Sequence, residues 1–147
     1  VWEVYGVNDM RLWEKLTHIK HNDVNVSIKG VINANLLIDV VCSADVCVHP
    51  SYIENSPNTV CEAQLLGAPV VVTDVGGTST LVKHDETGIV VPANDPYLLA
   101  SEVADLVLDG KKASLLGQNA RKVSLERHQP SKIVADLIGV FNKLVKD

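Results

Sequence analysis

The chain has 147 residues, of which 46% are hydrophobic, with a formal net charge of −5 and a pI of about 5.5. This length fits one domain with a sizeable core, and with one Phe and two Trp the core must come from Val, Leu, Ile and Ala. The acidic balance argues against a nucleic-acid surface, which needs a basic stripe, and no apolar run has the length of a membrane-spanning helix.

The three cysteines do not predict a metal site. Cys42, Cys47 and Cys61 are odd in number and lie in apolar patterns, and no pair of them has zinc-ligand spacing. We therefore expect small core residues in a reducing compartment.

Short β-rich segments followed by turn residues recur along the chain. Residues 70–72, Val-Val-Val, form a continuous apolar run that is typical of a strand buried on both faces. The first segment also predicts a buried strand. Strands are predicted at residues 1–5, 24–30, 46–48, 70–72 and 89–91.

Segments with helical spacing lie between and after these strands. Asn33 is a predicted helix cap, Asp95-Pro96 predicts a helix start, and Gly110 predicts the end of that helix. The last helix is amphipathic, and its apolar face is expected to point inward, with Ile133, Leu137, Val140, Phe141 and Leu144. Helices are predicted at residues 10–18, 33–41, 56–66, 78–82 and 95–107, from residue 112 onward, and at 131–145.

The order of these elements predicts an α/β fold. Strand and helix alternate, which implies right-handed βαβ units and an open parallel sheet flanked by helices. Ligands of such sheets bind beyond the carboxyl ends of the strands. We therefore expect a site where the loop after residues 46–48 leaves the sheet.

The helix predicted at residues 56–66 has signals at both ends. Ser56 is a good N-cap, and Pro57 fits the first helical position because its missing N–H would have no partner there. Gly67 supplies a left-handed residue at the other end, and Pro69 blocks continuation.

Two carboxylates flank this helix start. Glu54 lies on the loop before it and Glu62 in its second turn, with the unpaired N–H groups of Asn58, Thr59 and Val60 between them. A helix start attracts anions, whereas carboxylates accept hydrogen bonds from vicinal diols. Phosphate in the middle and diols on both sides predict a nucleotide-sugar ligand.

A longer set of residues also resembles a known family, the group 1 retaining glycosyltransferases (the GT4 family, with the GT-B fold), in their carboxyl-terminal, donor-binding domain. The resemblance extends from Gly30 to about Val107, and more loosely to both ends. Its core, two glutamates with seven residues between them, followed by Ala and Gly-x-Pro, is specific in combination. The matching residues are Ala44-Asp45, His49-Pro50-Ser51, Glu54, Pro57-Asn58, Glu62-Ala63, Gly67-Ala68-Pro69, Thr73-Asp74, Gly76-Gly77 and Gly88.

The resemblance implies a Rossmann-like donor domain over residues 1–147, with a role for each site residue. Glu54 would contact hydroxyls of the transferred sugar near the reacting carbon, as the catalytic residue. The donor-binding residues would be Glu62 at the ribose, Asn58, Thr59 and Val60 at the diphosphate and sugar, and Gly30 and Val31 against the base.

The family also implies an activity and partners. The expected reaction moves a hexose from a nucleoside-diphosphate sugar to an acceptor hydroxyl, on a sugar or lipid-linked sugar, as in polysaccharide biosynthesis. No metal or other cofactor is expected, since the helix start and basic side chains would take the metal's role. We expect a cytoplasmic location, with any membrane contact made through another domain.

The chain departs from the family pattern in two respects. Thr78-Ser79-Thr80 stands where the family has a glutamate shortly after the Gly-Gly pair. The family's Arg- and Lys-bearing pyrophosphate loop and its acceptor-binding amino-terminal domain are not found. We therefore expect a donor domain truncated at its start and inactive by itself.

Other interpretations remain open for the same residues. Glu54 and Glu62 could be a solvated loop acid and a helix-face acid, and Gly76-Gly77 is as well explained by a tight turn as by ligand contact. His49 is expected to pack at a strand end. At the level of function, the alternatives are a nucleotide-sugar epimerase domain and a non-catalytic nucleotide-sugar-binding module.

Overall fold

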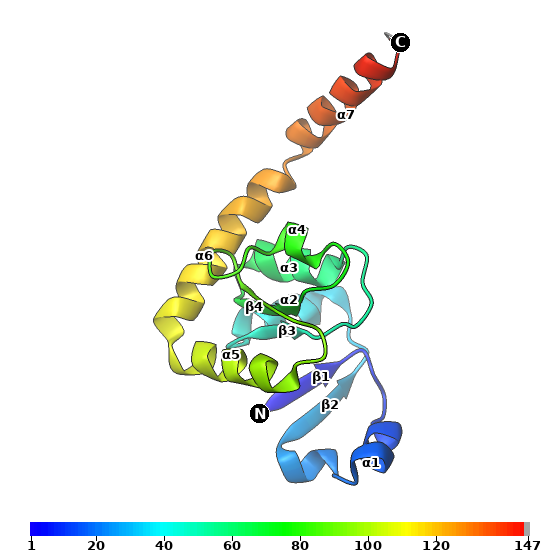
Figure 1. Ribbon diagram of the computed structural model, residues 1–147, viewed down its shortest axis with the longest axis vertical. Helices are drawn as coiled ribbons and strands as arrows, with labels where there is room; N and C mark the ends of the chain where they lie inside the picture. Colours follow the sequence, from blue (N-terminus) through cyan, green and yellow to red (C-terminus); the bar gives the residue numbers. More distant parts are fainter. Residues whose placement is uncertain (146–147) are drawn as a thin grey trace. The chain divides into compact units, whose positions relative to one another are not determined.

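The computed structural model describes residues 1–145, which divide into two compact units, Val1–Val40 and a second unit from Val41 onward (Figure 1). In the first unit, strand β1 (Trp2–Tyr5) pairs in parallel with β2 (Val26–Gly30), and α1 (Arg11–Thr17) and the 3-10 helix η1 (His21–Val24) connect them. The strand predicted at residues 1–5 is present, but the prediction that it is buried is wrong. Trp2 and Glu3 are exposed, because β1 belongs to a two-stranded sheet.

Helix α2 (Ala34–Ser43) follows the first sheet and begins at its predicted cap. The Leu36 N–H donates to Asn33 Oδ1 at 2.9 Å. At its far end Val41 packs against the core of the second unit, whereas Cys42 is exposed, so its predicted core position is wrong. A helix presents successive residues about 100° apart, so one neighbour of a core residue faces water.

The second unit is built on a three-stranded parallel sheet. Strands β3 (Cys47–His49) and β5 (Ile89–Val91) pair with the two edges of the central strand β4 (Val70–Thr73). Helix α3 (Asn58–Leu66) connects β3 to β4, and α4 (Thr78–Leu81) connects β4 to β5. The predicted α/β class with parallel strands is confirmed. The carboxyl ends of all three strands lie at one edge of this sheet.

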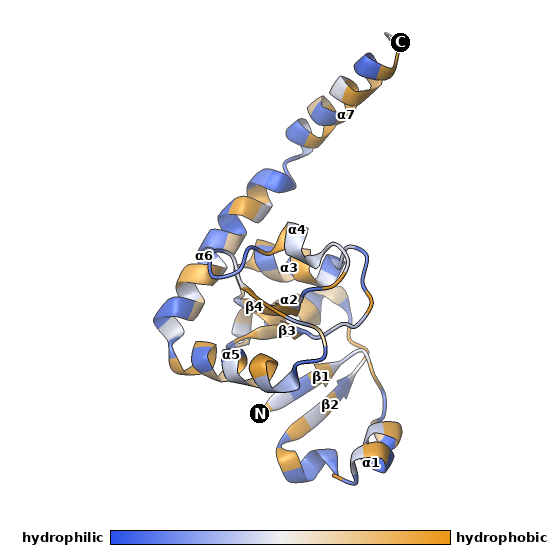
Figure 2. Ribbon diagram, in the orientation of Figure 1, coloured by the Kyte–Doolittle hydropathy of each residue, from blue (hydrophilic) through white to orange (hydrophobic). Residues whose placement is uncertain are grey.

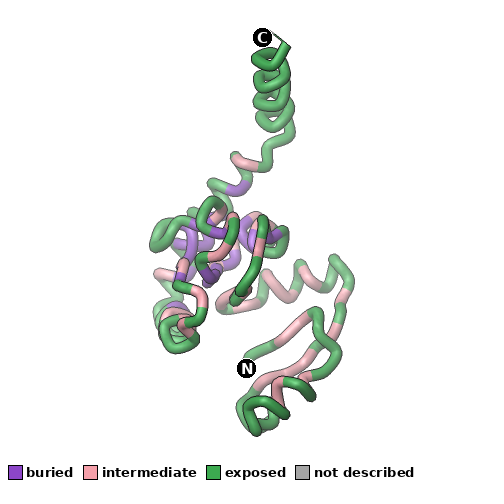
Figure 3. The backbone as a smooth tube through the Cα atoms, turned by 45° about the vertical axis from the view of Figure 1, so that its right-hand side comes forward, coloured by how far each residue is buried: buried purple, intermediate pink, exposed green. Residues whose placement is uncertain are grey.

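The core lies on both faces of β4. Val70 and Val72 pack on one face with residues of α3, and Val71 packs on the other with Leu106 and Leu116. Successive side chains of a strand point to opposite faces, so a run of three valines serves both. The predicted two-sided burial is confirmed, and Figure 3 shows the buried positions gathered in this unit.

Helices α5 (Pro96–Leu108) and α6 (Gly110–Arg127) follow the sheet. Asp95 caps α5 as predicted, accepting from the Leu98 N–H at 2.9 Å. Helix α5 ends at Leu108, close to its predicted end, but Asp109 follows it as the cap residue and Gly110 is the first residue of α6. Asp109 caps that helix by accepting from the N–H groups of Lys111 and Lys112.

Helix α6 packs closely against α3. Gly67 ends α3 in the left-handed conformation, with φ of +81°, and the Ala68 N–H donates to the Ala63 carbonyl at 3.0 Å, so the predicted cap is confirmed. Opposite it lies Gly117 of α6, where a Cβ atom would overlap the Gly67 carbonyl oxygen.

A polar network joins α3, α4 and α6 beside this packing. Arg127 of α6 donates to Gln64 Oε1 at 2.7 Å and to the Leu81 carbonyl at 3.2 Å, and buried Gln64 donates to the same carbonyl at 2.9 Å. The network holds α3 and α4 at a fixed separation on one side of the sheet.

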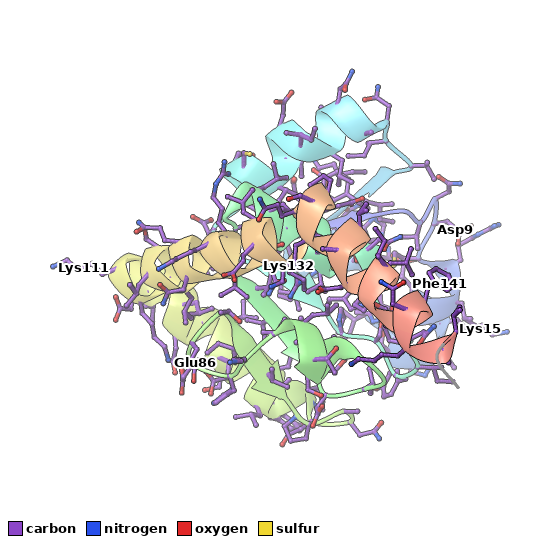
Figure 4. The ribbon with its side chains drawn as sticks, turned by 90° about the horizontal axis from the view of Figure 1, so that it is seen from above. Asp9, Lys15, Glu86, Lys111, Lys132 and Phe141 are labelled. Atoms are coloured by element: carbon purple, nitrogen blue, oxygen red, sulfur yellow. The ribbon has the colours of Figure 1, made fainter. Side chains whose placement is uncertain are left out.

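Helix α7 (Pro130–Leu144) ends the described chain. Its apolar and polar residues segregate as the sequence predicts (Figure 2). The predicted inward packing is wrong, since Phe141, labelled in Figure 4, is 57% exposed and no residue of α7 is buried. Periodicity reveals an apolar face but not whether another element covers it.

Candidate functional site

The candidate site begins at the carboxyl end of β3, where the loop of residues 50–57 leaves the sheet. The Thr73 hydroxyl, at the end of β4, donates to the Ser51 carbonyl at 2.6 Å and so ties the start of this loop to the neighbouring strand. Thr73 is buried, so the bond is shielded from water. Spacing in the sequence does not reveal this contact, which joins residues 22 apart.

Glu54 is held by both of its carboxylate oxygens. Oε1 accepts from the Asn55 N–H at 2.9 Å, and Oε2 lies 3.0 Å from Nε2 of His49. The Asn55 N–H, and then the His49 ring, lower the pKa of Glu54 below its usual value, so the carboxylate is ionised at neutral pH. Its side chain is 24% exposed. A fixed carboxylate at an open loop is suited to accept hydrogen bonds from hydroxyl groups.

The Gly76-Gly77 turn lies against the backbone of the Glu54 loop. The Gly77 N–H donates to the Asn55 carbonyl at 2.7 Å, and a Cβ at Gly76 would overlap the Glu54 carbonyl oxygen. The two glycines therefore make a tight turn that fixes this loop. In the following helix, the buried Thr78 bonds through its hydroxyl to the Val75 carbonyl.

Helix α3 starts beside this loop, one residue later than predicted. Pro57 has φ −73° and ψ 112°, an extended conformation, and occupies the cap position. Its carbonyl accepts from the Cys61 N–H at 3.3 Å. The predicted Ser56 cap is wrong, because an extended Pro57 excludes Ser56 from the helix end, and no side chain caps α3.

The absence of a side-chain cap leaves the helix start open. The N–H groups of Asn58, Thr59 and Val60 precede the first helical hydrogen bond, which belongs to Cys61. Asn58 and Thr59 are exposed. These N–H groups offer an anion three donors at the positive end of a helix dipole.

Glu62 lies on the same helix, one turn after Asn58, with its side chain exposed. Within residues 1–145 its side chain forms no hydrogen bond or ion pair. The structure therefore brings Glu54, the helix start and Glu62 into one region of the second unit, as the spacing in the sequence predicted.

Gly30 and Val31 belong to the first unit. Gly30 ends β2 with φ +70°, and Val31 is 73% exposed. Their role at the base of a nucleotide stays a prediction.

A family model described as "Glycosyl transferases group 1" matches residues 4–123. The chain belongs to this family. This agrees with the resemblance found at Glu54, Glu62 and the residues around them.

Curated relatives of this group 1 chain are themselves glycosyltransferases. It is 31% identical over 142 residues to MJ1607 of Methanocaldococcus jannaschii, an uncharacterized glycosyltransferase, covering 94% of this chain and 36% of that protein. It is 30% identical over 137 residues to a D-inositol 3-phosphate glycosyltransferase of Xylanimonas cellulosilytica, covering 93% and 33%. The chain thus spans about a third of each relative.

Solved structures of glycosyltransferases share the fold of this group 1 chain. Sucrose-phosphate synthase from Thermosynechococcus elongatus matches with a TM-score of 0.82 and 26% identity, over 98% of this chain and 38% of that one. HepE from Anabaena, in complex with UDP-glucose, matches with a TM-score of 0.79 and 20% identity, over 96% and 40%. The predicted Rossmann-like arrangement of a GT-B glycosyltransferase is confirmed.

Among the described residues there is neither a metal-binding cluster nor a membrane-spanning helix. Across residues 1–145, no three His, Cys, Asp or Glu side chains gather where they could hold a metal ion. None of the helices in that range combines the length and apolar character needed to cross a bilayer.

His49 makes more contacts in the candidate site than its sequence position predicts. It was expected only to pack at a strand end, yet its ring contacts Glu54, Ser51 and Thr59. The available signal was a His-Pro-Ser step directly before the glutamate loop.

Proposed function

We propose that this group 1 chain is the donor-binding domain of a retaining glycosyltransferase that uses a nucleoside-diphosphate sugar. The observation that carries the proposal is the combination of an ionised, doubly held Glu54, an open helix start and an exposed Glu62. HepE, which shares the fold, is solved with UDP-glucose, and this supports a donor of the same class.

Each part of the site has a task in this proposal. The N–H groups at residues 58–60 bind the diphosphate, Glu62 accepts hydrogen bonds from the ribose hydroxyls, and Glu54 accepts them from the sugar. The donor is thereby held from ribose to sugar.

The proposed reaction breaks the bond between the anomeric carbon and the diphosphate and forms a bond to an acceptor oxygen. The leaving nucleoside diphosphate keeps the electron pair of the broken bond, and its phosphate oxygen accepts the proton of the acceptor hydroxyl. Negative charge develops on the diphosphate, where the helix N–H groups stabilise it, and positive charge develops at the anomeric carbon, near Glu54. We propose that no metal is needed, because these donors face the charge that a metal would otherwise neutralise.

The acceptor is assigned to a part of the protein outside these 147 residues. The relatives are about three times longer than the stretch they share with this chain, which supports a second domain for the acceptor.

Titrating a variant that lacks the Glu62 charge with nucleoside diphosphates tests the proposal. Glu62→Gln should weaken binding of the best nucleoside diphosphate by about 1.5–3 kcal/mol, or roughly 10- to 150-fold in Kd. Isothermal calorimetry with UDP, GDP and ADP would measure it, with circular dichroism to confirm the fold.

Glu126→Gln is the matched control, since Glu126 is an exposed helical glutamate of α6. Its affinity should equal that of the parent chain. Equal affinity of Glu62→Gln and the parent would remove the ribose role, and absence of binding by every nucleotide would refute donor binding.

A further inference from the structure

His49 lies between the two parts of the candidate site. It is the last residue of β3, and its side chain is 24% exposed. Its Nε2 lies 3.0 Å from Glu54 Oε2 and 3.0 Å from Ser51 Oγ, and its Nδ1 lies 3.4 Å from Thr59 Oγ1. One ring thus contacts the loop glutamate and the first turn of α3.

The chemistry of the partners fixes the proton on the Glu54 side of the ring. An ionised carboxylate accepts hydrogen bonds and donates none, so Nε2 must carry the proton that faces Glu54. A threonine hydroxyl both donates and accepts, so Thr59 suits Nδ1 with or without a proton. The contact with Glu54 therefore exists for the neutral imidazole and for the imidazolium.

The contact determines which way the carboxylate presents its remaining lone pairs. Each carboxylate oxygen has about two acceptor sites. The Asn55 N–H uses one site on Oε1 and His49 uses one on Oε2, so one site on each oxygen is left for a ligand. Without His49, Oε2 of Glu54 would lose the only side-chain hydrogen-bond donor that it has within the described residues.

We propose that His49 is a positioning residue that orients Glu54 toward the hydroxyl groups of the donor's sugar. The inference rests on the proposed function and adds a specificity to it. The His49–Glu54 pair selects the sugar-bearing nucleotide over the bare nucleoside diphosphate, which the helix start and Glu62 bind without it.

The test compares affinities for UDP and UDP-glucose, with GDP and GDP-mannose as the second pair. For the pair that binds more tightly, the Kd of the bare diphosphate divided by the Kd of the nucleotide-sugar gives the contribution of the sugar. His49→Leu removes the N–H group that donates to Glu54. This variant should reduce the ratio about tenfold, while the Kd for the bare diphosphate changes less than twofold. A merely structural role would weaken both ligands alike.

Matched variants separate orientation from folding. His49→Gln keeps an N–H donor at the reach of Nε2 and should retain most of the ratio, whereas His49→Asn stays polar but ends short of Glu54 and should lose it. The Asn variant carries the test if the Leu variant does not fold. In a Glu54→Gln background, His49→Leu should cause no further loss.

Several outcomes would overturn the inference. The first is an unchanged Kd ratio in His49→Leu or His49→Asn. The second is an equal loss of affinity for the diphosphate and the nucleotide-sugar. The third is a further, additive loss of affinity when His49→Leu is combined with Glu54→Gln. A parent chain that binds the diphosphate but gains nothing from the sugar would overturn it while leaving diphosphate binding intact. A parent chain that binds neither ligand would overturn the proposed function together with it.

Discussion

At the scale of single residues, the site depends on how Glu54 is held in place. The Asn55 N–H and the His49 ring hold its two oxygens, and the Gly76-Gly77 turn lies against its backbone. The glutamate gains its orientation from segments more than 20 residues away as well as from its neighbours.

Gly76→Ala should displace this loop. Gly76 has φ +54°, which costs an L-residue about 1–2 kcal/mol, and the added Cβ would overlap the Glu54 carbonyl. We expect a lower melting temperature and a strong loss of nucleotide-sugar binding. Gly139→Ala on α7 is the control, because its Cβ would meet nothing within 4 Å. A Gly76→Ala chain that binds like the parent would contradict the role of the turn.

Cys47 should behave as a protected thiol. Burial raises the pKa of Cys47 from 9.0 to about 11, so the folded chain keeps the proton while the unfolded chain loses it above pH 9. Stability should therefore fall as pH rises from about 9 to 11. At pH 8 a thiol reagent should label exposed Cys42 well before Cys47.

Denaturant unfolding at pH 8 and pH 10.5 measures the effect on stability. In Cys47→Ala the loss between these pH values should be smaller than in the parent chain. Equal losses in the two chains would show that Cys47 does not titrate with unfolding.

At the scale of elements, α3 is the part of the second unit that most needs a fixed position. Its first turn supplies the N–H donors, its middle joins the Arg127–Gln64 network, and its end meets α6 at Gly117. Packing at the far end therefore determines where the donors point.

Gly67→Ala and Gly117→Ala should both destabilise the chain, for different reasons. A Cβ at Gly67 meets Arg121 at an ordinary 3.5 Å, so its cost is the positive φ, about 1–2 kcal/mol. A Cβ at Gly117 overlaps the Gly67 carbonyl, so its cost is overpacking, about 1–3 kcal/mol or more. Thermal or urea denaturation would measure both, and a melting temperature at or above the parent's would contradict the corresponding account.

Most elements followed from local signals in the sequence. The Gly67 cap, the Asn33 and Asp95 caps and the buried valines of β4 depend on residues close in the chain. The predictions that were wrong depend on backbone conformation and packing as well as on local signals. Pro57, for example, adopts an extended conformation and occupies the cap position predicted for Ser56.

The remaining features of the site depend on contacts that spacing does not reveal. The bond from Gly77 to Asn55 and the burial of Thr73 arise only when the strand ends meet. The exposure of α7 could not be predicted, because an apolar stripe of the right period is the same whether or not a partner covers it.

At the scale of the whole molecule, we propose that the chain supplies the donor side of a transfer reaction. The second unit carries the proposed diphosphate and sugar contacts, and the proposed acceptor site lies in another part of the protein. Bringing donor and acceptor together in one closed site supplies much of the rate of such a reaction.

The 147-residue chain should therefore bind donor but transfer no sugar. Incubation with its best nucleotide-sugar and candidate hydroxyl acceptors, followed by mass spectrometry, would measure transfer. Product that disappears in Glu54→Gln would show that the chain is catalytically complete. A nucleotide-sugar whose sugar has changed configuration would instead favour an epimerase.

The central claim is that the first turn of α3 binds the diphosphate of a nucleotide-sugar. The most direct measurement is a nuclear magnetic resonance titration of the 15N-labelled chain with UDP, following each backbone amide. We predict that the amides of Asn58, Thr59 and Val60 show the largest shifts and saturate together, with Glu62 close behind. Largest shifts elsewhere in the second unit, with these three amides unmoved, would contradict the account.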